Sequence, residues 1–257
     1  MVSINDVLHF LWEIAPEDRK ETWDNVGHLV GRGKTAVTKI LIALDITMPV
    51  IHEAAEMGAE LIVSHHPVIW DNYRHVTDQV FQQEKVLTLI EHKISAICMH
   101  TNLDEAEDGV DDTLVEQLGL TAVSHLAEGR IGHICLLNEP MDLTTFLSLV
   151  KSQLCANGLR YCDAGRSVQK IALGCGSCGE YLKEAVKAGC DTFLTGDVKY
   201  NYFIDALGCG INLIDAGHYP TENPIVGKLV KKLRTAFPQT EVEATRCLSQ
   251  PDLYFCD

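Results

Sequence analysis

The hydrophobic and polar positions along the chain repeat as two copies of one pattern. Each copy has an apolar strand, a turn, an amphipathic helix closed by glycine, and a second short apolar strand. The copies begin at Lys39 and Lys170, an offset of 131 residues, and Gly58 and Gly189 keep that offset as the helix-ending glycines. A period that changes from strand to helix and back is typical of a βαβ unit. The sequence therefore predicts a duplicated βαβ unit.

Both copies continue through another helix into a further strand, ISAICMH in the first copy and INLIDAGH in the second. Strands that alternate with helices favour an α/β fold with parallel strands. Between the copies, GRIGH and ICLL indicate an edge strand, and MDLTTFLSLVKSQL indicates a helix. We expect two intertwined α/β/α lobes. Lobe A covers about residues 1–125, with or without the C-terminal segment 238–257, and lobe B covers about residues 126–237.

Composition narrows the class of protein. The hydrophobic content of 46% and charged content of 22% are ordinary for a globular chain, and no apolar run approaches the roughly 18 residues of a membrane span. The N-terminus lacks the basic region and cleavage site of a signal peptide. Ten scattered cysteines without such a signal favour reduced thiols in a cytoplasmic protein. The net charge of −15, with no segregated basic block, argues against nucleic-acid binding.

Polar residues gather where four of the predicted strands end. In open α/β sheets, ligands bind beyond the carboxyl ends of the strands. We therefore expect these groups to converge at a cleft between the lobes. The four groups are His65 with His66, His100 with Asp104, Gly196 with Asp197, and His218 with Glu222.

Five of these residues form a set of metal ligands: His65, His66, Asp104, His218 and Glu222. Imidazole and carboxylate donors suit Zn, Mn, Fe, Co or Ni rather than Ca, and five donors are too many for one tetrahedral ion. We predict two divalent metal ions per chain, with a carboxylate such as Glu222 bridging them. Each motif alone also fits a turn or the acidic start of a helix. Their coincidence at several strand ends favours the metal site.

Several segments closely resemble the family of GTP cyclohydrolase I type 2 homologs, also called Nif-three-like proteins. The resemblance extends over nearly the whole chain, so residues 1–257 are expected to form one family domain of two lobes. The matching segments are WDNVG at 23–27, EAAEMGAELIVSHHP at 53–67, HTNLDEAEDGVDD at 100–112, GRIG at 129–132, LTGDVKYN at 194–201 and INLIDAGHYPTE at 211–222.

The resemblance implies a dinuclear metal centre and a toroidal homohexamer. By this similarity, His65 and Asp104 would hold one ion, His66 and His218 would hold the other, and Glu222 would bridge them. It also points to a metal-dependent hydrolase acting on a nucleotide or a related ring or phosphoester substrate. A metal-binding scaffold or interacting factor without significant catalysis would use the same ligands and stays open as the alternative.

Three further residues are candidates for catalysis, and a cysteine pair has two interpretations. If the protein is a hydrolase, a group that is not a ligand must move protons, and we assign this role to His100. Asp197 and Lys199 are additional candidates near an adjacent strand end. Cys175 and Cys178 form a CxxC motif, which fits either a redox or zinc pair or a tight loop that tolerates small residues.

Overall fold

The computed structural model describes residues 1–247 and 250–254, which divide into two compact units. Unit 1 contains residues 1–107 and 225–247, and unit 2 contains residues 108–224 and 250–254. Each unit therefore takes two segments of the chain. The divisions after residues 107 and 224 come earlier than the lobe boundaries expected near 125 and 237. One reason is that the helix following residue 109 packs on the first two strands of unit 2.

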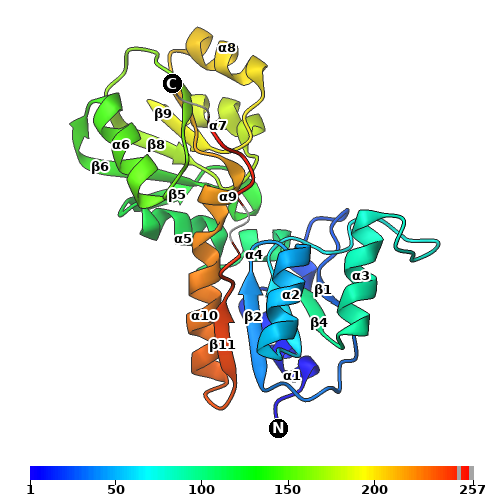
Figure 1. Cartoon of the computed structure of the whole chain (residues 1–257). Helices are drawn as coiled ribbons and strands as arrows, with labels where there is room; N and C mark the ends of the chain where they lie inside the picture. The colour runs from blue at the N-terminus through cyan, green and yellow to red at the C-terminus, as the bar shows by residue number, and fades with distance from the viewer. Residues whose placement is uncertain (248–249, 255–257) are drawn as a thin grey trace. The chain divides into compact units, whose positions relative to one another are not determined.

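Unit 1 is built on a five-stranded sheet of order β1-β4-β3-β2-β11 (Figure 1). The last four strands of this order run parallel to one another, and β1 is antiparallel to β4. The strands are β1 (Gly27–Val30), β2 (Lys39–Ala43), β3 (Leu61–Ser64), β4 (Ser95–Cys98) and β11 (Glu241–Ala244). Every position of β3 and β4 is buried, as expected for parallel strands covered on both faces.

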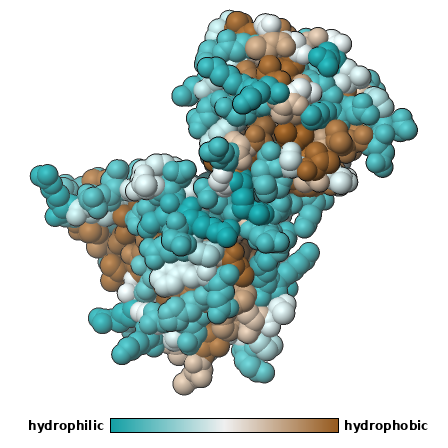
Figure 2. Space-filling view, turned by 180° about the vertical axis from the view of Figure 1, so that it is seen from behind, coloured by the Kyte–Doolittle hydropathy of each residue, from teal (hydrophilic) through white to brown (hydrophobic). Residues whose placement is uncertain are grey.

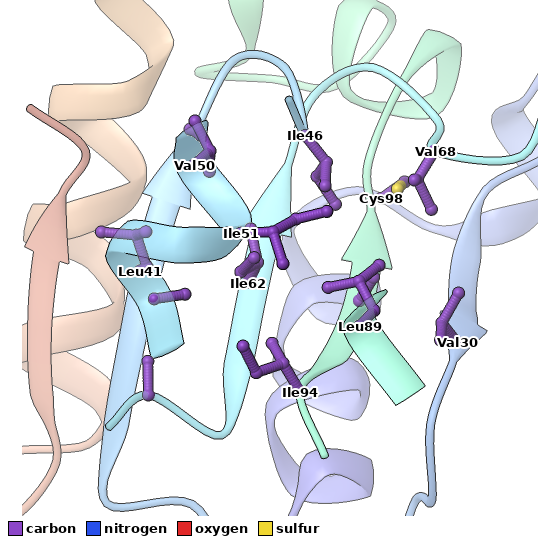
Figure 3. Packing of buried hydrophobic residues seen from close by; sticks show 14 of the residues in the cluster. Val30, Leu41, Ile46, Val50, Ile51, Ile62, Val68, Leu89, Ile94 and Cys98 are labelled. Atoms are coloured by element: carbon purple, nitrogen blue, oxygen red, sulfur yellow. The ribbon is translucent and has the colours of Figure 1, made fainter. Parts of the chain in front are cut away.

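Helices cover both faces of this sheet, with α2 and α3 on one side and α1 on the other (Figure 1). The helical elements are α1 (Ile4–Ile14), η1 (Glu17–Arg19), α2 (Met48–Met57), α3 (Phe81–Glu91), α4 (Thr101–Asp104) and α10 (Pro224–Ala236). Ser3 caps α1 in a capping box with Asp6. Ile51 of α2 and Leu89 of α3 belong to the same buried cluster as Ile62 of β3 (Figure 3).

Unit 2 is built on a six-stranded sheet of order β5-β6-β8-β9-β10-β7. The three strands β8, β9 and β10 are parallel, and the remaining pairs are antiparallel. The strands are β5 (Thr121–His125), β6 (His133–Met141), β7 (Arg160–Cys162), β8 (Val168–Leu173), β9 (Thr192–Thr195) and β10 (Asn212–Asp215). The prediction that GRIGH and ICLL form an edge strand is wrong about the position of the strand in the sheet. These residues contribute β6, which lies inside the sheet because β5 pairs with its outer side.

The helical elements of unit 2 include the helix predicted between the copies. Asp142 caps it by accepting a hydrogen bond from the Thr145 backbone N–H at 2.9 Å. The elements are α5 (Val110–Gln117), η2 (Glu128–Arg130), α6 (Leu143–Gln153), η3 (Gly179–Tyr181), α7 (Leu182–Lys187), α8 (Tyr200–Cys209) and α9 (His218–Glu222). The unit has its own core, in which Phe193 of β9 and Leu213 of β10 are fully buried.

The duplication extends to individual hydrogen bonds. Glu60 accepts the backbone N–H of Lys39 at 2.9 Å at the start of β2. Asp191, 131 residues later, accepts the backbone N–H of Lys170 at 2.7 Å at the start of β8. In both units, the acidic residue that precedes one strand (β3 or β9) therefore fixes the beginning of its parallel neighbour (β2 or β8). The predicted duplicated α/β fold is confirmed.

The surface alternates between hydrophilic areas and smaller hydrophobic patches on the face that Figure 2 presents. Among residues 1–247 and 250–254, no helix has both the length and the apolar character needed to cross a membrane. The nine cysteines in this part of the chain form no disulfide bond.

Candidate metal centre

Three imidazoles of unit 1 lie together beyond the ends of β3 and β4. These strands are parallel neighbours with Ser64 opposite Cys98, so the residues that follow them emerge at the same edge of the sheet. We call His65, His66 and His100 the histidine cluster. Their ring centroids are 4.9 to 5.6 Å apart, and one potential ligand atom from each lies within 4.8 Å of the others.

Each ring of the histidine cluster donates its Nδ1–H to an acceptor that is fixed by the fold. A neutral imidazole with a proton on Nδ1 carries its lone pair on Nε2, the form in which histidine binds a metal. Metal-binding histidines usually have such a partner on the other nitrogen. The bonds run from His65 to the Met99 carbonyl at 2.8 Å, from His66 to Asp45 at 2.7 Å, and from His100 to Asp24 at 2.9 Å.

Asp24 is the most strongly held of these acceptors. Its side chain is fully buried, and it also accepts the Thr101 backbone N–H at 3.0 Å and the Thr101 hydroxyl at 2.5 Å. Burial alone would raise the pKa of Asp24, but the hydrogen bonds from His100 and Thr101 outweigh it and lower the pKa to about 2. Asp24 is therefore ionised at neutral pH and holds the His100 ring in one orientation.

Asp104 lies at the end of α4, one helical turn after His100. Its Oδ1 is 3.5 Å from Nε2 of His65. With metal–ligand bonds of about 2.0–2.2 Å, two ligands of one tetrahedral ion lie about 3.4 Å apart. The separation therefore fits the prediction that His65 and Asp104 hold the same ion.

Unit 2 presents a second group on α9, where His218 and Glu222 are four residues apart on one helical face. We call them the His–Glu pair. Nε2 of His218 is 3.1 Å from Oε2 of Glu222, again the spacing of two ligands of one ion. Nδ1 of His218 donates to Asp197 at 2.8 Å, so the pair repeats the tautomer arrangement of the histidine cluster.

The CxxC segment forms the loop that supports α9. The Cys175 thiol donates to the Thr221 carbonyl at 3.3 Å, and the Gly176 N–H donates to the Thr221 hydroxyl at 3.0 Å. Gly176 has a φ of +57°, and a Cβ built at this position would overlap Oε1 of Glu222. The glycine between the two cysteines therefore allows the loop to approach the His–Glu pair closely.

Sequence reasoning placed the main residues near the strand ends but missed their acceptors. His100, expected as a proton-transfer group, lies inside the histidine cluster, and Asp197 contacts His218. Lys199 is exposed just before α8. Asp24 and Asp45 were not predicted. Asp45 does follow the end of β2, a position that could have indicated its role.

Comparison with known proteins identifies the family. A sequence profile described as Duf34/NIF3 (NGG1p interacting factor 3) matches residues 2–252. The chain belongs to the Duf34/NIF3 family. A GTP cyclohydrolase 1 type 2 homolog of Clostridium perfringens is 37% identical over 240 residues, covering 91% of this chain and 92% of the relative. The homolog of Clostridium acetobutylicum is 34% identical, covering 98% of this chain and 97% of the relative. The predicted resemblance is thus confirmed.

Solved structures share the fold of this chain. A hypothetical protein of Staphylococcus aureus matches with a TM-score of 0.90 and 28% identity, covering 98% of this chain and 99% of that chain. A Bacillus cereus protein related to NIF3 matches with a TM-score of 0.92 and 21% identity, covering 99% of both chains. The arrangement of sheets and helices described above is therefore that of the Duf34/NIF3 fold.

Proposed function

We propose that this protein binds two divalent metal ions. The ligands are His65, His66 and Asp104 of unit 1 and His218 and Glu222 of unit 2. The observation that carries the proposal is the common orientation of the three histidines, each of which directs Nδ1 to a fixed acceptor, so that Nε2 is the nitrogen suited to bind a metal. The nitrogen and oxygen donors suit Zn, Mn, Fe, Co or Ni.

We further propose that the protein is a metal-dependent hydrolase acting on a nucleotide or a related ring or phosphoester substrate. The names of the curated relatives support this class of substrate. Bound divalent ions would polarise the scissile group and lower the pKa of water to supply hydroxide near neutral pH. The residues of the chain then have to bind and orient the substrate and move protons.

His100 is proposed as the proton-transfer group, with Asp24 holding its Nδ1–H. Such an acid–histidine pair fixes the ring and stabilises the imidazolium form when Nε2 accepts a proton. Asp197 and Lys199 remain further candidates. The main role proposed for Asp197 is that of a positioning residue, because its carboxylate orients the His218 ring.

Elemental analysis tests the metal proposal. Purified protein is expected to retain about two transition-metal ions per chain after mild metal loading and desalting, because the ligand set is too large for one ion. One ion or none in the folded protein would contradict the dinuclear centre. The loaded protein is then screened against nucleotides and phosphoesters. Two bound ions without turnover on any substrate would support the metal-binding scaffold instead of the hydrolase.

Gly176→Ala is expected to reduce metal retention because the new methyl group would displace Glu222. Gly189→Ala is the matched control, since it has a φ of +72° but its Cβ meets no atom within 4 Å. Both variants should lose about 1–2 kcal/mol of stability from backbone strain, measured by thermal unfolding. Only Gly176→Ala should also lose metal in elemental analysis. Equal metal contents would show that the loop does not position Glu222.

We also propose self-association as a homohexamer, on the basis of the family resemblance. Light scattering at micromolar concentration tests it, and a monomeric mass would contradict it.

A further inference from the structure

Two exposed tryptophans lie beside the histidine cluster in unit 1. Trp23 is 63% exposed and Trp70 is 49% exposed, although large aromatic side chains normally bury most of their surface. Their ring centroids are 5.9 Å and 5.2 Å from that of His100. Trp70 is also 6.4 Å from His66. Both indoles therefore border the imidazoles that are proposed to bind metal or move protons.

Neither indole stacks face to face on His100. The interplanar angles are 73° for Trp23 and 85° for Trp70, so both contacts are edge contacts. Trp70 also contacts His66, with an interplanar angle of 40°, yet about half of its surface stays exposed, as does more than half of the surface of Trp23. Each indole therefore keeps apolar surface open to solvent beside the cluster.

The loops that carry the two tryptophans are held together by hydrogen bonds. Trp23 precedes Asp24, whose carboxylate is fixed by His100 and Thr101. The next residue, Asn25, donates its side-chain N–H to the Ile69 carbonyl at 2.7 Å, and Ile69 precedes Trp70. A backbone fixed in this way reduces the ordering cost of binding, as expected for a built recognition surface.

We propose that Trp23 and Trp70 form a stacking subsite for a planar heteroaromatic ring, such as a purine base. The proposal rests on the proposed function, because it names the part of the substrate that unit 1 recognises. A ring stacked on an indole has its centroid about 4.5–7 Å from that of the indole. The centroid of Trp70 is itself 5.2 Å from that of His100. A base stacked on Trp70 therefore lies next to the histidine cluster.

The chemistry of the surroundings favours a neutral planar ring over other ligands. An aromatic pair can also bind an organic cation through its π-faces, but the adjoining imidazoles are proposed to hold divalent ions that would repel one. An aliphatic ligand would not need two flat rings on fixed loops. Stacking on aromatic side chains is the common way in which proteins hold a single base.

Equilibrium dialysis with guanosine monophosphate tests the subsite, in both metal-free and metal-loaded full-length protein. Trp70→Ala and Trp23→Ala are each expected to weaken binding by about tenfold to a hundredfold, the usual effect of losing one stacking contact. Trp70→Phe should recover part of the affinity. Trp12→Phe is the matched control, because Trp12 is the third tryptophan of the chain and lies on α1. Its substitution should leave the affinity unchanged.

Ribose 5-phosphate and tetramethylammonium separate the alternatives. The first carries the sugar phosphate without a base and should bind much more weakly than guanosine monophosphate. Equal affinity for the two, no binding of guanosine monophosphate at millimolar concentration, or unchanged affinity in both alanine variants would overturn the proposal. Tighter, tryptophan-dependent binding of tetramethylammonium would replace it with a cation site.

Metal content and turnover distinguish failure of the subsite from failure of the proposed function. Tryptophan-dependent binding of the base in a protein that retains no metal would uphold the subsite and reject the metal centre. Two bound ions, hydrolysis of substrates that carry no ring, and no effect of either tryptophan substitution would uphold the metal-dependent hydrolase and reject the subsite. All tryptophan variants should retain the metal content of the unaltered protein, because neither indole offers a ligand atom.

Discussion

The His100→Asn variant is expected to lose about 10²- to 10⁴-fold in turnover while keeping nearly two metal ions per chain. This is the usual contribution of a positioned acid–base group. Asp24, whose pKa is lowered to about 2, stays ionised at neutral pH and holds the Nδ1–H of His100. The ring thus offers Nε2 for proton transfer. Steady-state kinetics on the substrate found in the screen, together with elemental analysis, measure both quantities.

The position of His100 in the histidine cluster also fits a metal ligand, and the two measurements separate these roles. Loss of one metal equivalent in His100→Asn would make this residue a ligand. Unchanged turnover with full metal content would leave it a structural histidine. His92→Asn provides the control, because His92 is an exposed residue at the end of α3 and its substitution should change neither quantity.

Glu222→Gln is expected to weaken binding of both ions, whereas Asp104→Asn should chiefly empty one. Glu222 is proposed to bridge the ions, so loss of its charge affects two coordination spheres. Asp104 is proposed to share the ion of His65, because its Oδ1 lies 3.5 Å from Nε2 of that histidine. Metal titration of each variant, followed by elemental analysis of the desalted protein, gives the number of ions that remain.

Glu180→Gln serves as the control for removing one carboxylate charge, since Glu180 is exposed in unit 2. It should bind metal like the unaltered protein. Similar and mild losses from Glu222→Gln and Asp104→Asn would show that the bridge is misassigned. Loss of both ions in Asp104→Asn alone would place the bridge at that residue instead.

Local sequence patterns determined most of the fold. Apolar runs predicted the parallel strands of both units. The glycines at 58 and 189 marked the ends of the repeated helices, because glycine adopts the left-handed backbone conformation found there at little energetic cost. The same patterns placed His65, His66 and His100 at the ends of neighbouring strands. Parallel strands bring their carboxyl ends to one edge, so the histidine cluster could be expected from the order of elements alone.

Only the tertiary structure decided which residues support that cluster. Asp24 lies 76 residues before His100 and in no regular element, so no period in the sequence connects them. The contact of Gly176 with Glu222 likewise depends on how a loop packs against α9. β6 proved to be an interior strand because β5, a short and mostly exposed strand, pairs with it. Hydrophobic periodicity reports which face of an element is buried, whereas hydrogen-bond partners and strand order depend on contacts between distant segments.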